Sequence, residues 1–230
     1  RVLKGEGYHV VPVGMDRYGM DVERLQASGA MIAYVMPSHQ YPTGIVMPVK
    51  RRQELLAWAY SGQGRYLIED DYDSEFRYKG KPIPALQGMD RGGRVIYMGT
   101  FSKSIAPAIR VGFMVLPEHL VKVYREKAGF YASTVSRIDQ NILYQFITQG
   151  YYERHLNRMR ALYKGKHDAL MTGLKELEDR FLIRGEYAGL HVLLTHRQGE
   201  AEERLVARAA ALGVKVYGIS GCFIQPEANL

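Results

Sequence analysis

The sequence predicts an α/β domain built on a mostly parallel sheet, followed by a smaller α+β unit. Three observations support this fold class: short strand-like runs alternate with helical stretches, the runs are almost continuously apolar, and the pattern changes after Pro117. Strands that are buried on both faces of a parallel sheet are expected to be continuously apolar. Alternation of strands with helices is typical of layered α/β domains.

One clear helix is predicted between the second and third strand-like runs of the first unit. This helix begins at Pro48, whose fixed φ suits a first helical turn, and ends at Tyr60. The five expected strands span residues 8–13, 31–36, 65–69, 94–98 and 111–116. Ligands of such sheets bind at the carboxyl ends of the strands, so we expect the functional residues just after Met36, Glu69 and Met98.

The part of the chain after Pro117 is predicted to be helical at first and mixed afterwards. Residues 118–149 read as helix with a break near Gly129, and a second helix follows. The remaining expected elements are that helix at 151–178, strands at 182–184 and 190–195, a helix at 200–212 and a strand at 214–218. We place the boundary so that residues 1–150 form the large domain and residues 151–230 an interdomain helix with a partial small domain.

Both ends of the chain look cut. Residues 1–6 read like the end of a helix that leads into a strand, and there is no initiator methionine. Residues 225–230 stop in a loop, with no strand to complete the last unit. We therefore expect a fragment of a longer protein, in which the large domain is truncated.

Composition indicates a globular protein that needs no disulfide to hold its core. Hydrophobic residues make up 47% and charged residues 24% of the 230 residues, which is ordinary for such a protein. The single cysteine, Cys222, fits a reducing compartment, so we expect a cytoplasmic location. There is no signal peptide and no apolar run long enough to cross a bilayer, so no membrane partner is expected.

The net charge of +7 is compatible with nucleic acid or with anionic ligands. The basic residues are scattered, however, as in residues 50–52 and 154–166. Scattered Lys and Arg residues are typical of solvated helix faces. We therefore expect these residues on such faces rather than on a surface that itself binds nucleic acid.

The most informative stretch is Gly-Thr-Phe-Ser-Lys-Ser at residues 99–104, which follows a predicted strand. A lysine rarely stands at the end of a buried strand. Partial desolvation would lower the pKa of the Lys103 amine and make it a nucleophile toward an aldehyde. The hydroxyls of Thr100 and Ser102 and the planar guanidinium of Arg110 can bind phosphate oxygens. Taken alone, the Ser-Lys pair favours an exposed lysine in a turn between a strand and a loop.

A second stretch ends a predicted apolar strand in a group of carboxylates, Glu-Asp-Asp-Tyr-Asp at residues 69–73. Clustered carboxylates repel each other, so the site needs a cation or protons. A pyridinium nitrogen is such a cation, because an aspartate that keeps it protonated preserves the ring as an electron sink. Tyr72 could then donate to the phenolic oxygen of the ring. A divalent metal is the competing interpretation, although no clear histidine or cysteine partner stands nearby, and a surface turn is the third.

A third stretch, Pro-Ser-His-Gln-Tyr-Pro-Thr-Gly at residues 37–44, places a turn after a predicted strand. Together the three stretches, in this order, resemble the fold-type I aminotransferases. More narrowly, they resemble the aminotransferase-like domain of MocR/GabR-type transcription regulators of the GntR superfamily. The resemblance covers nearly the whole chain and is strongest over residues 34–117.

The resemblance implies pyridoxal 5′-phosphate (PLP) as the cofactor and assigns roles by position. Lys103 would hold PLP as a Schiff base, Asp70 would pair with the pyridinium nitrogen, and Tyr72 would contact the ring oxygen. Three residues would bind the cofactor phosphate: Thr100, Ser102 and Arg110. The resemblance also implies a homodimer, a small amino compound as effector or substrate, and DNA binding through a domain outside this chain.

The chain departs from typical aminotransferases at Tyr41, which stands where an asparagine usually precedes Pro-Thr-Gly and contacts the ring oxygen. His39 or Tyr72 could take over that contact. His191, in a Gly-Leu-His segment, is expected either near the site or in a packing role. The phosphate-cradling loop, the ring-stacking aromatic residue and the substrate-carboxylate arginine of the family are expected outside this chain.

Three functions follow as alternatives. The first is a PLP-binding domain that senses an amino compound within a transcription regulator, and Tyr41 favours it. The second is a genuine aminotransferase, in which Lys103 also moves the proton between the α-carbon of the amino acid and the cofactor. The third is a domain that folds without the cofactor, because several charge-assisted contacts of about 1.5–3 kcal/mol each are expected outside it.

Overall fold

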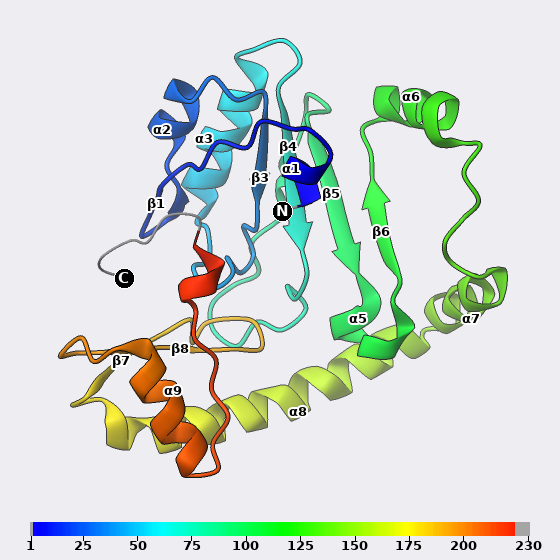
Figure 1. Ribbon diagram of the computed structural model, residues 1–230. Coiled ribbons are helices and arrows are strands. Elements are labelled where there is room, and N and C mark those ends of the chain that lie inside the picture. The colour runs from blue at the N-terminus through cyan, green and yellow to red at the C-terminus, as the bar shows by residue number, and fades with distance from the viewer. Residues whose placement is uncertain (1, 224–230) are drawn as a thin grey trace.

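Four strands form the central sheet of the computed structural model, which describes residues 2–223 (Figure 1). Their order is β3-β4-β5-β6. The strands β3 (Ile32–Val35), β4 (Tyr66–Asp71) and β5 (Val95–Thr100) are parallel, whereas β6 (Gly112–Val115) runs antiparallel to β5. The predicted α/β class with a mostly parallel sheet is therefore confirmed, and the antiparallel strand at its edge is an addition.

The sheet is covered on one face by two helices, α2 (Val22–Ala27) and α3 (Val49–Tyr60), which lie side by side in Figure 1. Leu55 and Trp58 of α3 belong to the same buried cluster as Val35 and Leu67 of the sheet. Burial alternates along β3 and β4, and β6 is exposed throughout. The expectation that the strands are buried on both faces is therefore wrong for the described residues, because these helices cover one face.

The helix α3 begins directly after Pro48, as predicted, but two of its arginines do not lie on a solvated face. Arg52 is 1% exposed, and its guanidinium lies 3.9 Å from the Glu69 carboxylate. It donates to three backbone carbonyls at 2.9–3.1 Å, those of Pro37, Met47 and Pro84. Arg51 pairs with Asp16 at 2.7 Å. The expectation of solvated basic residues is thus wrong for this part of the helix.

The first residues form short elements that precede α2 in the chain. These are α1 (Val2–Gly5), β1 (Met15–Asp16) and β2 (Gly19–Met20), and the last two pair antiparallel. The predicted helical end is confirmed at Val2–Gly5, but residues 8–13 form no strand. They are exposed or half-buried, and no neighbouring strand among the described residues accepts their backbone hydrogen bonds.

The segment after β4 is mainly helical and contains one long helix. After α4 (Leu86–Met89), α5 (Phe101–Ser104) and a short 3-10 turn at Pro107–Ile109, the helices α6 (Glu118–Ala128) and α7 (Arg137–Thr148) follow with the predicted break between them. Helix α8 (Tyr151–Leu174), extended by a 3-10 turn at Lys175–Leu177, then runs beneath the sheet to a smaller unit (Figure 1). The predicted helices of this region are confirmed.

The smaller unit holds β7 (Phe181–Arg184) and β8 (Leu193–His196), which pair antiparallel, and α9 (Glu202–Ala211). The predicted strand at 214–218 is wrong, and a 3-10 turn at Ser220–Cys222 follows this segment instead. The Glu202 carboxylate accepts from the backbone N–H groups of Ile219 and Ser220, which follow this segment. The expectation of a loop at 225–230 lies outside the described residues.

One contact between the smaller unit and the large one joins the segment before β8 to the loop after β4. The backbone N–H of Tyr78 donates to the carbonyl of Tyr187 at 3.0 Å, and Arg77 forms an isolated bridge with Ala188. This contact holds the segment before β8 against the loop that follows β4. It thereby places the two loops on either side of the same opening.

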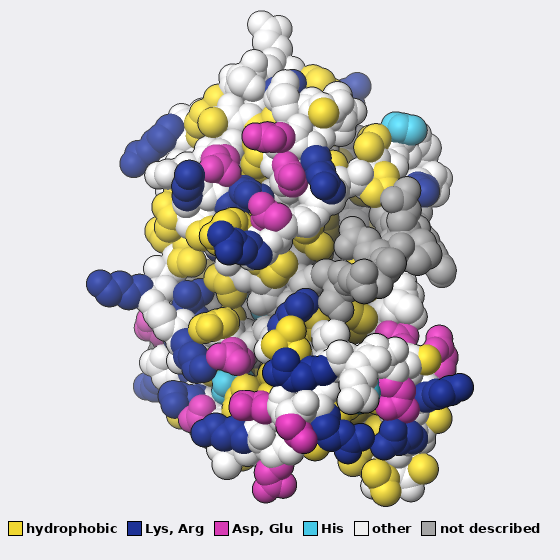
Figure 2. Space-filling model, turned by 90° about the vertical axis from the view of Figure 1, so that its left-hand side faces the viewer, with side chains coloured by type: hydrophobic (Ala, Val, Ile, Leu, Met, Phe, Trp, Pro, Cys, Tyr) yellow, Lys and Arg dark blue, Asp and Glu magenta, His cyan; other side chains and the backbone are white. Residues whose placement is uncertain are grey.

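Charges of both signs are interspersed on the face shown in Figure 2, and the Lys and Arg side chains form no continuous patch there. This agrees with the scattered basic residues of the sequence. Among residues 2–223, no helix is both long and apolar enough to cross a bilayer.

Candidate functional site

A pocket of about 400 Å³ lies where the ends of the parallel strands meet the smaller unit. Its walls come from each of the three motif stretches and from the segment before β8. The lining residues are Met36, Tyr41, Tyr72, Asp73, Lys103, Leu190 and His191. Three of the eight predicted site residues therefore share one pocket: Tyr41, Tyr72 and Lys103.

Lys103 reaches the pocket from α5, a single helical turn at the end of β5. The turn is capped by Thr100, whose Oγ1 accepts from the backbone N–H of Ser102 at 3.1 Å. The side chain of Lys103 is exposed. The expectation of a partly desolvated amine at Lys103 stays a prediction.

Two side chains of α8 form hydrogen bonds with Ser104 at the end of α5. Ser104 is 1% exposed, and its Oγ accepts from the Tyr152 hydroxyl at 3.1 Å. Nε2 of His155 lies 3.0 Å from the carbonyl oxygen of Ser104. These positioning contacts connect residues about fifty positions apart, and the motif at 99–104 contains no signal for them.

Three predicted phosphate-binding residues lie at one end of the β5–β6 pair and do not line the pocket. The ladder pairs Thr100 with Gly112, which places Arg110 at the same end as Thr100 and Ser102. Arg110 is exposed and has a φ of 50°, in the left-handed region. No hydrogen bond involves its guanidinium within residues 2–223, and its role in phosphate binding stays a prediction.

Successive side chains of β4 point to opposite faces of the sheet, and this separates the carboxylates within residues 69–71. Glu69 and Asp71 are buried on the covered face. Glu69 accepts from the N–H groups that start α4, at 2.9 Å each, and burial raises the pKa of its carboxyl. Asp71 accepts from the Tyr97 hydroxyl at 2.7 Å. Glu69 and Asp71 therefore each have a partner within the protein, and the expectation that the group takes up a cation or protons stays a prediction.

Asp70 lies on the opposite face of β4 and is not among the residues that line the pocket. Its carboxylate accepts from the hydroxyl of Tyr34 on the neighbouring strand. Burial, followed by this contact, raises the pKa of Tyr34 well above its usual range, so the phenol stays a donor. Pairing of Asp70 with a pyridinium nitrogen stays a prediction. It requires that the Asp70 carboxylate bind both the nitrogen and the Tyr34 hydroxyl, or give up the hydroxyl.

A buried pair of His39 and Asp73 stands behind Tyr72. The Nδ1 atom of His39 lies 2.9 Å from Oδ2 of Asp73 and 3.2 Å from the Tyr72 hydroxyl. His39 is 1% exposed and Asp73 2% exposed. Burial, with the nearby carboxylates, raises the pKa of Tyr72 far above its usual range. Tyr72 therefore keeps its proton and presents a hydrogen-bond donor at the pocket wall.

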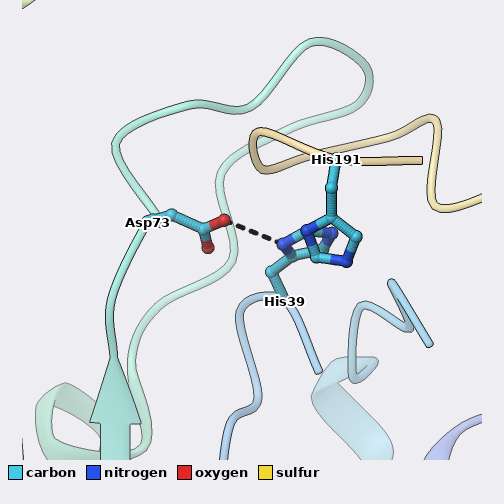
Figure 3. Close-up of side chains that lie close together, drawn as sticks. All are labelled: His39, Asp73 and His191. Atoms are coloured by element: carbon cyan, nitrogen blue, oxygen red, sulfur yellow. Dashed lines mark hydrogen bonds and ion pairs between the residues drawn. The ribbon is translucent and has the colours of Figure 1, made fainter. Parts of the chain in front are cut away.

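His191 completes a cluster with this pair, as Figure 3 shows. Its ring centroid lies 4.5 Å from that of His39, and its Nε2–H donates to the Pro42 carbonyl at 3.1 Å. One possible ligand atom from each of His39, Asp73 and His191 lies within 4.8 Å of the others. The expectation that no histidine stands near the carboxylates is wrong, because both histidines are far from Asp73 in sequence.

Gly189 leaves the space that the His39 ring occupies. It has a φ of +77°, and a Cβ there would overlap the His39 ring and lie 2.6 Å from Oδ2 of Asp73. Gly189→Ala should therefore lower the free energy of unfolding by about 2–5 kcal/mol, through backbone strain and displacement of the ring. Gly213→Ala is the matched control, because Gly213 has a φ of +76° but open space around it. Equal losses in urea unfolding would contradict the packing role of Gly189.

A pH dependence is expected from His191. Burial, followed by the nearby His39, lowers the pKa of His191. Below about pH 6.5 the unfolded chain therefore takes up a proton that the folded chain does not, so stability falls until the pH passes the folded-state pKa. His191→Asn should reduce the difference between the unfolding free energies at about pH 7.5 and about pH 5.5. An unchanged difference would contradict this assignment.

Known proteins similar to this chain fall into two groups. It is 41% identical over 221 residues to the uncharacterized HTH-type transcriptional regulator YdeL of Bacillus subtilis, covering 96% of this chain and 48% of that protein. It is 34% identical over 224 residues to the probable rhizopine catabolism regulatory protein MocR of Rhizobium meliloti, covering 97% of this chain and 45% of that protein. A solved Pyrococcus horikoshii kynurenine aminotransferase in complex with PMP aligns with a TM-score of 0.76 and 28% identity, over 89% of this chain and 53% of that one.

The chain thus spans about half the length of the curated relatives it matches. The relatives confirm the resemblance to MocR-type regulators that the three sequence stretches indicated, and the solved structure confirms the fold-type I architecture. The family described as "Aminotransferase class I and II" matches residues 1–220. The chain therefore belongs to the class I and II aminotransferase family.

Proposed function

We propose that this chain is the PLP-binding, amino-compound-sensing part of a MocR-type transcription regulator. The single observation that carries the proposal is the position of Lys103, the lysine of the 99–104 motif, on the wall of a pocket of about 400 Å³. The regulators YdeL and MocR support the regulatory role. DNA binding through another domain, a homodimeric parent and a cytoplasmic location belong to the same proposal, as does the division into residues 1–150 and 151–230.

Membership of the family implies PLP as the cofactor, and the donor set of the pocket fits it. An amine, two phenols, a carboxylate and a half-buried imidazole line it, beside the apolar side chains of Met36 and Leu190. PLP supplies an electrophilic aldehyde and an electron sink when it is bound. Lys103 would hold PLP covalently, and Thr100, Ser102 and Arg110 would bind its phosphate.

Tyr72 is the residue whose chemistry the structure defines best. Its raised pKa keeps the hydroxyl protonated, and the His39–Asp73 pair behind it limits the directions in which the hydroxyl can point. Tyr72 would therefore donate to an anionic ring oxygen. The pair can supply the orientation that an asparagine at position 41 gives in typical aminotransferases, where this chain has Tyr41.

Lys103 also fits a sensing role. An amino compound that enters the pocket would compete with the Lys103 amine for the aldehyde carbon of the cofactor. Exchange changes what Lys103 holds, and α5 is tied to the long helix α8 through Ser104. We infer that this connection transmits the exchange from the pocket to the rest of the protein.

The test compares exchange with turnover in the full-length protein loaded with PLP. A panel of small amino compounds is titrated while the visible spectrum is recorded, and DNA binding is measured with and without each compound. A spectral change limited to one equivalent, together with altered DNA affinity, supports the sensor. A compound that changes the spectrum but never the DNA affinity would overturn it.

The second candidate function is a genuine aminotransferase, which the similarity to the kynurenine aminotransferase favours. In that case Lys103 would also carry the proton that moves to and from the substrate α-carbon. Repeated turnovers with an amino donor and a keto acid, lost in Lys103→Ala, would identify the enzyme. Transfer that stops after one equivalent would exclude it.

A further inference from the structure

We propose that His39, Asp73 and His191 bind one divalent cation of the zinc type on the wall of the pocket. The three side chains come from separate segments, the loops after β3 and β4 and the segment before β8, and they converge in Figure 3. One nitrogen or oxygen atom from each lies within 4.8 Å of the other two. The proposal does not depend on PLP, because none of the three residues is needed to hold it covalently.

Two buried atoms of this cluster lack a partner. The side chains of His39 and Asp73 are 0% and 2% exposed. His39 Nδ1 and Asp73 Oδ2 face each other, but His39 Nε2 and Asp73 Oδ1 have no hydrogen-bond partner among the described residues. Buried polar atoms are rarely left in this state, and both atoms offer lone pairs when His39 is neutral and Asp73 ionised. Because His39 faces Asp73 with Nδ1, its Nε2 atom points away from the carboxylate, so one cation would give a partner only to Asp73 Oδ1. His39 would bind this cation through Nδ1, with its proton moved to Nε2.

The donor types select the kind of cation. His191 donates through Nε2 to the Pro42 carbonyl, which leaves its Nδ1 atom with a lone pair. A ring that binds metal through one nitrogen while the other donates to a carbonyl or carboxylate is the usual arrangement of metal-bound histidine. Two imidazoles and one carboxylate, with a fourth position open, suit Zn²⁺. Mg²⁺ and Ca²⁺ prefer oxygen ligands throughout.

The geometry requires a modest closure of the cluster. Ligand atoms around tetrahedral Zn²⁺, with bonds of about 2.1 Å, lie roughly 3.4 Å apart. The spread of up to 4.8 Å must therefore shrink when the cation binds. The Lys103 ammonium on the same pocket opposes a cation, whereas the Asp73 carboxylate attracts one. The fourth coordination position faces the pocket and is open to water or to an incoming ligand.

The test is calorimetric titration of the metal-stripped chain with ZnCl₂, repeated with CoCl₂ while the visible spectrum is recorded. We expect one equivalent of Zn²⁺ and Co²⁺ absorption bands typical of four-coordinate nitrogen and oxygen ligation. His191→Asn should weaken Zn²⁺ binding at least tenfold, on the order of the loss that a supporting residue alone can cause. His39→Asn and Asp73→Asn should do the same, with circular dichroism confirming that each variant folds.

Two control variants separate this site from adventitious binding. His9 and Cys222 are exposed and lie outside the cluster, so His9→Asn and Cys222→Ser should bind Zn²⁺ as the wild type does. Histidine side-chain NMR should show that His39 and His191 signals move on titration, which a purely structural role would not produce. Unchanged affinity in His191→Asn, loss of binding in Cys222→Ser, or Mg²⁺ binding as tightly as Zn²⁺ would each overturn the proposal.

Discussion

Lys103→Ala is expected to abolish the covalent attachment of PLP to this chain. Lys103 supplies the only primary amine among the side chains that line the pocket of the described residues. Mixing PLP with the wild type should give the visible band of lysine-bound cofactor, and borohydride reduction should then fix one label on the peptide that contains Lys103. The variant should show at least a tenfold loss of label, because no second amine stands within reach on the pocket wall.

A matched control addresses non-specific reaction of PLP with surface lysines. Lys122 is exposed on α6 and does not line the pocket, so Lys122→Ala should be labelled like the wild type. The absorption spectra and the mapped peptides check this together. Identical spectra and equal labelling of the wild type and Lys103→Ala would remove the basis for a PLP site at this position.

Arg52→Met is expected to cause the largest loss of stability from a single side chain. The guanidinium is buried and donates to three backbone carbonyls, and it lies near the buried carboxylate of Glu69. Methionine fills similar space but leaves these carbonyls without their donor and Glu69 without a nearby positive charge. The expected decrease in the free energy of unfolding is about 3–5 kcal/mol, measured by urea unfolding.

Lys50→Met provides the control, since Lys50 is an exposed cation on the same helix, two positions away. Its loss should change the free energy of unfolding by no more than about 0.5 kcal/mol. The double variant Arg52→Met/Glu69→Gln should lose less than the sum of the single variants, because the buried charge is removed with its partner. A decrease below about 1 kcal/mol for Arg52→Met would show that the buried arginine is dispensable.

Elements with a local signal could be predicted from the sequence. Helix α3 begins where Pro48 indicated, and the break before α7 falls where Gly129 indicated. The direction of β6 could not be predicted, because an apolar run does not encode which way its neighbour lies. Residues 8–13 and 214–218 have the composition of strands but no partner strand within the described chain, and pairing is a tertiary property.

The location of the pocket could be predicted more reliably than the contacts in it. Each motif stretch follows a strand, so Lys103 and Tyr72 come together at one edge of the sheet. The partners of the carboxylates could not be predicted, because the alternation of β4 sends Asp70 and Asp71 to opposite faces. The pairing of Asp73 with His39 joins loops after different strands, and no spacing within either motif indicates it.

The position of β6 has a consequence for handling the protein. This strand has a single strand neighbour among the described residues, so its other backbone edge is unpaired there, and its apolar side chains are exposed. Phe113, Met114 and Val115 are 41%, 49% and 41% exposed. Such an edge is a template for the addition of a further strand, so preparations of this chain should aggregate through β6 as the concentration rises. Met114→Lys, which introduces a charge at this edge, should raise the concentration at which light scattering begins.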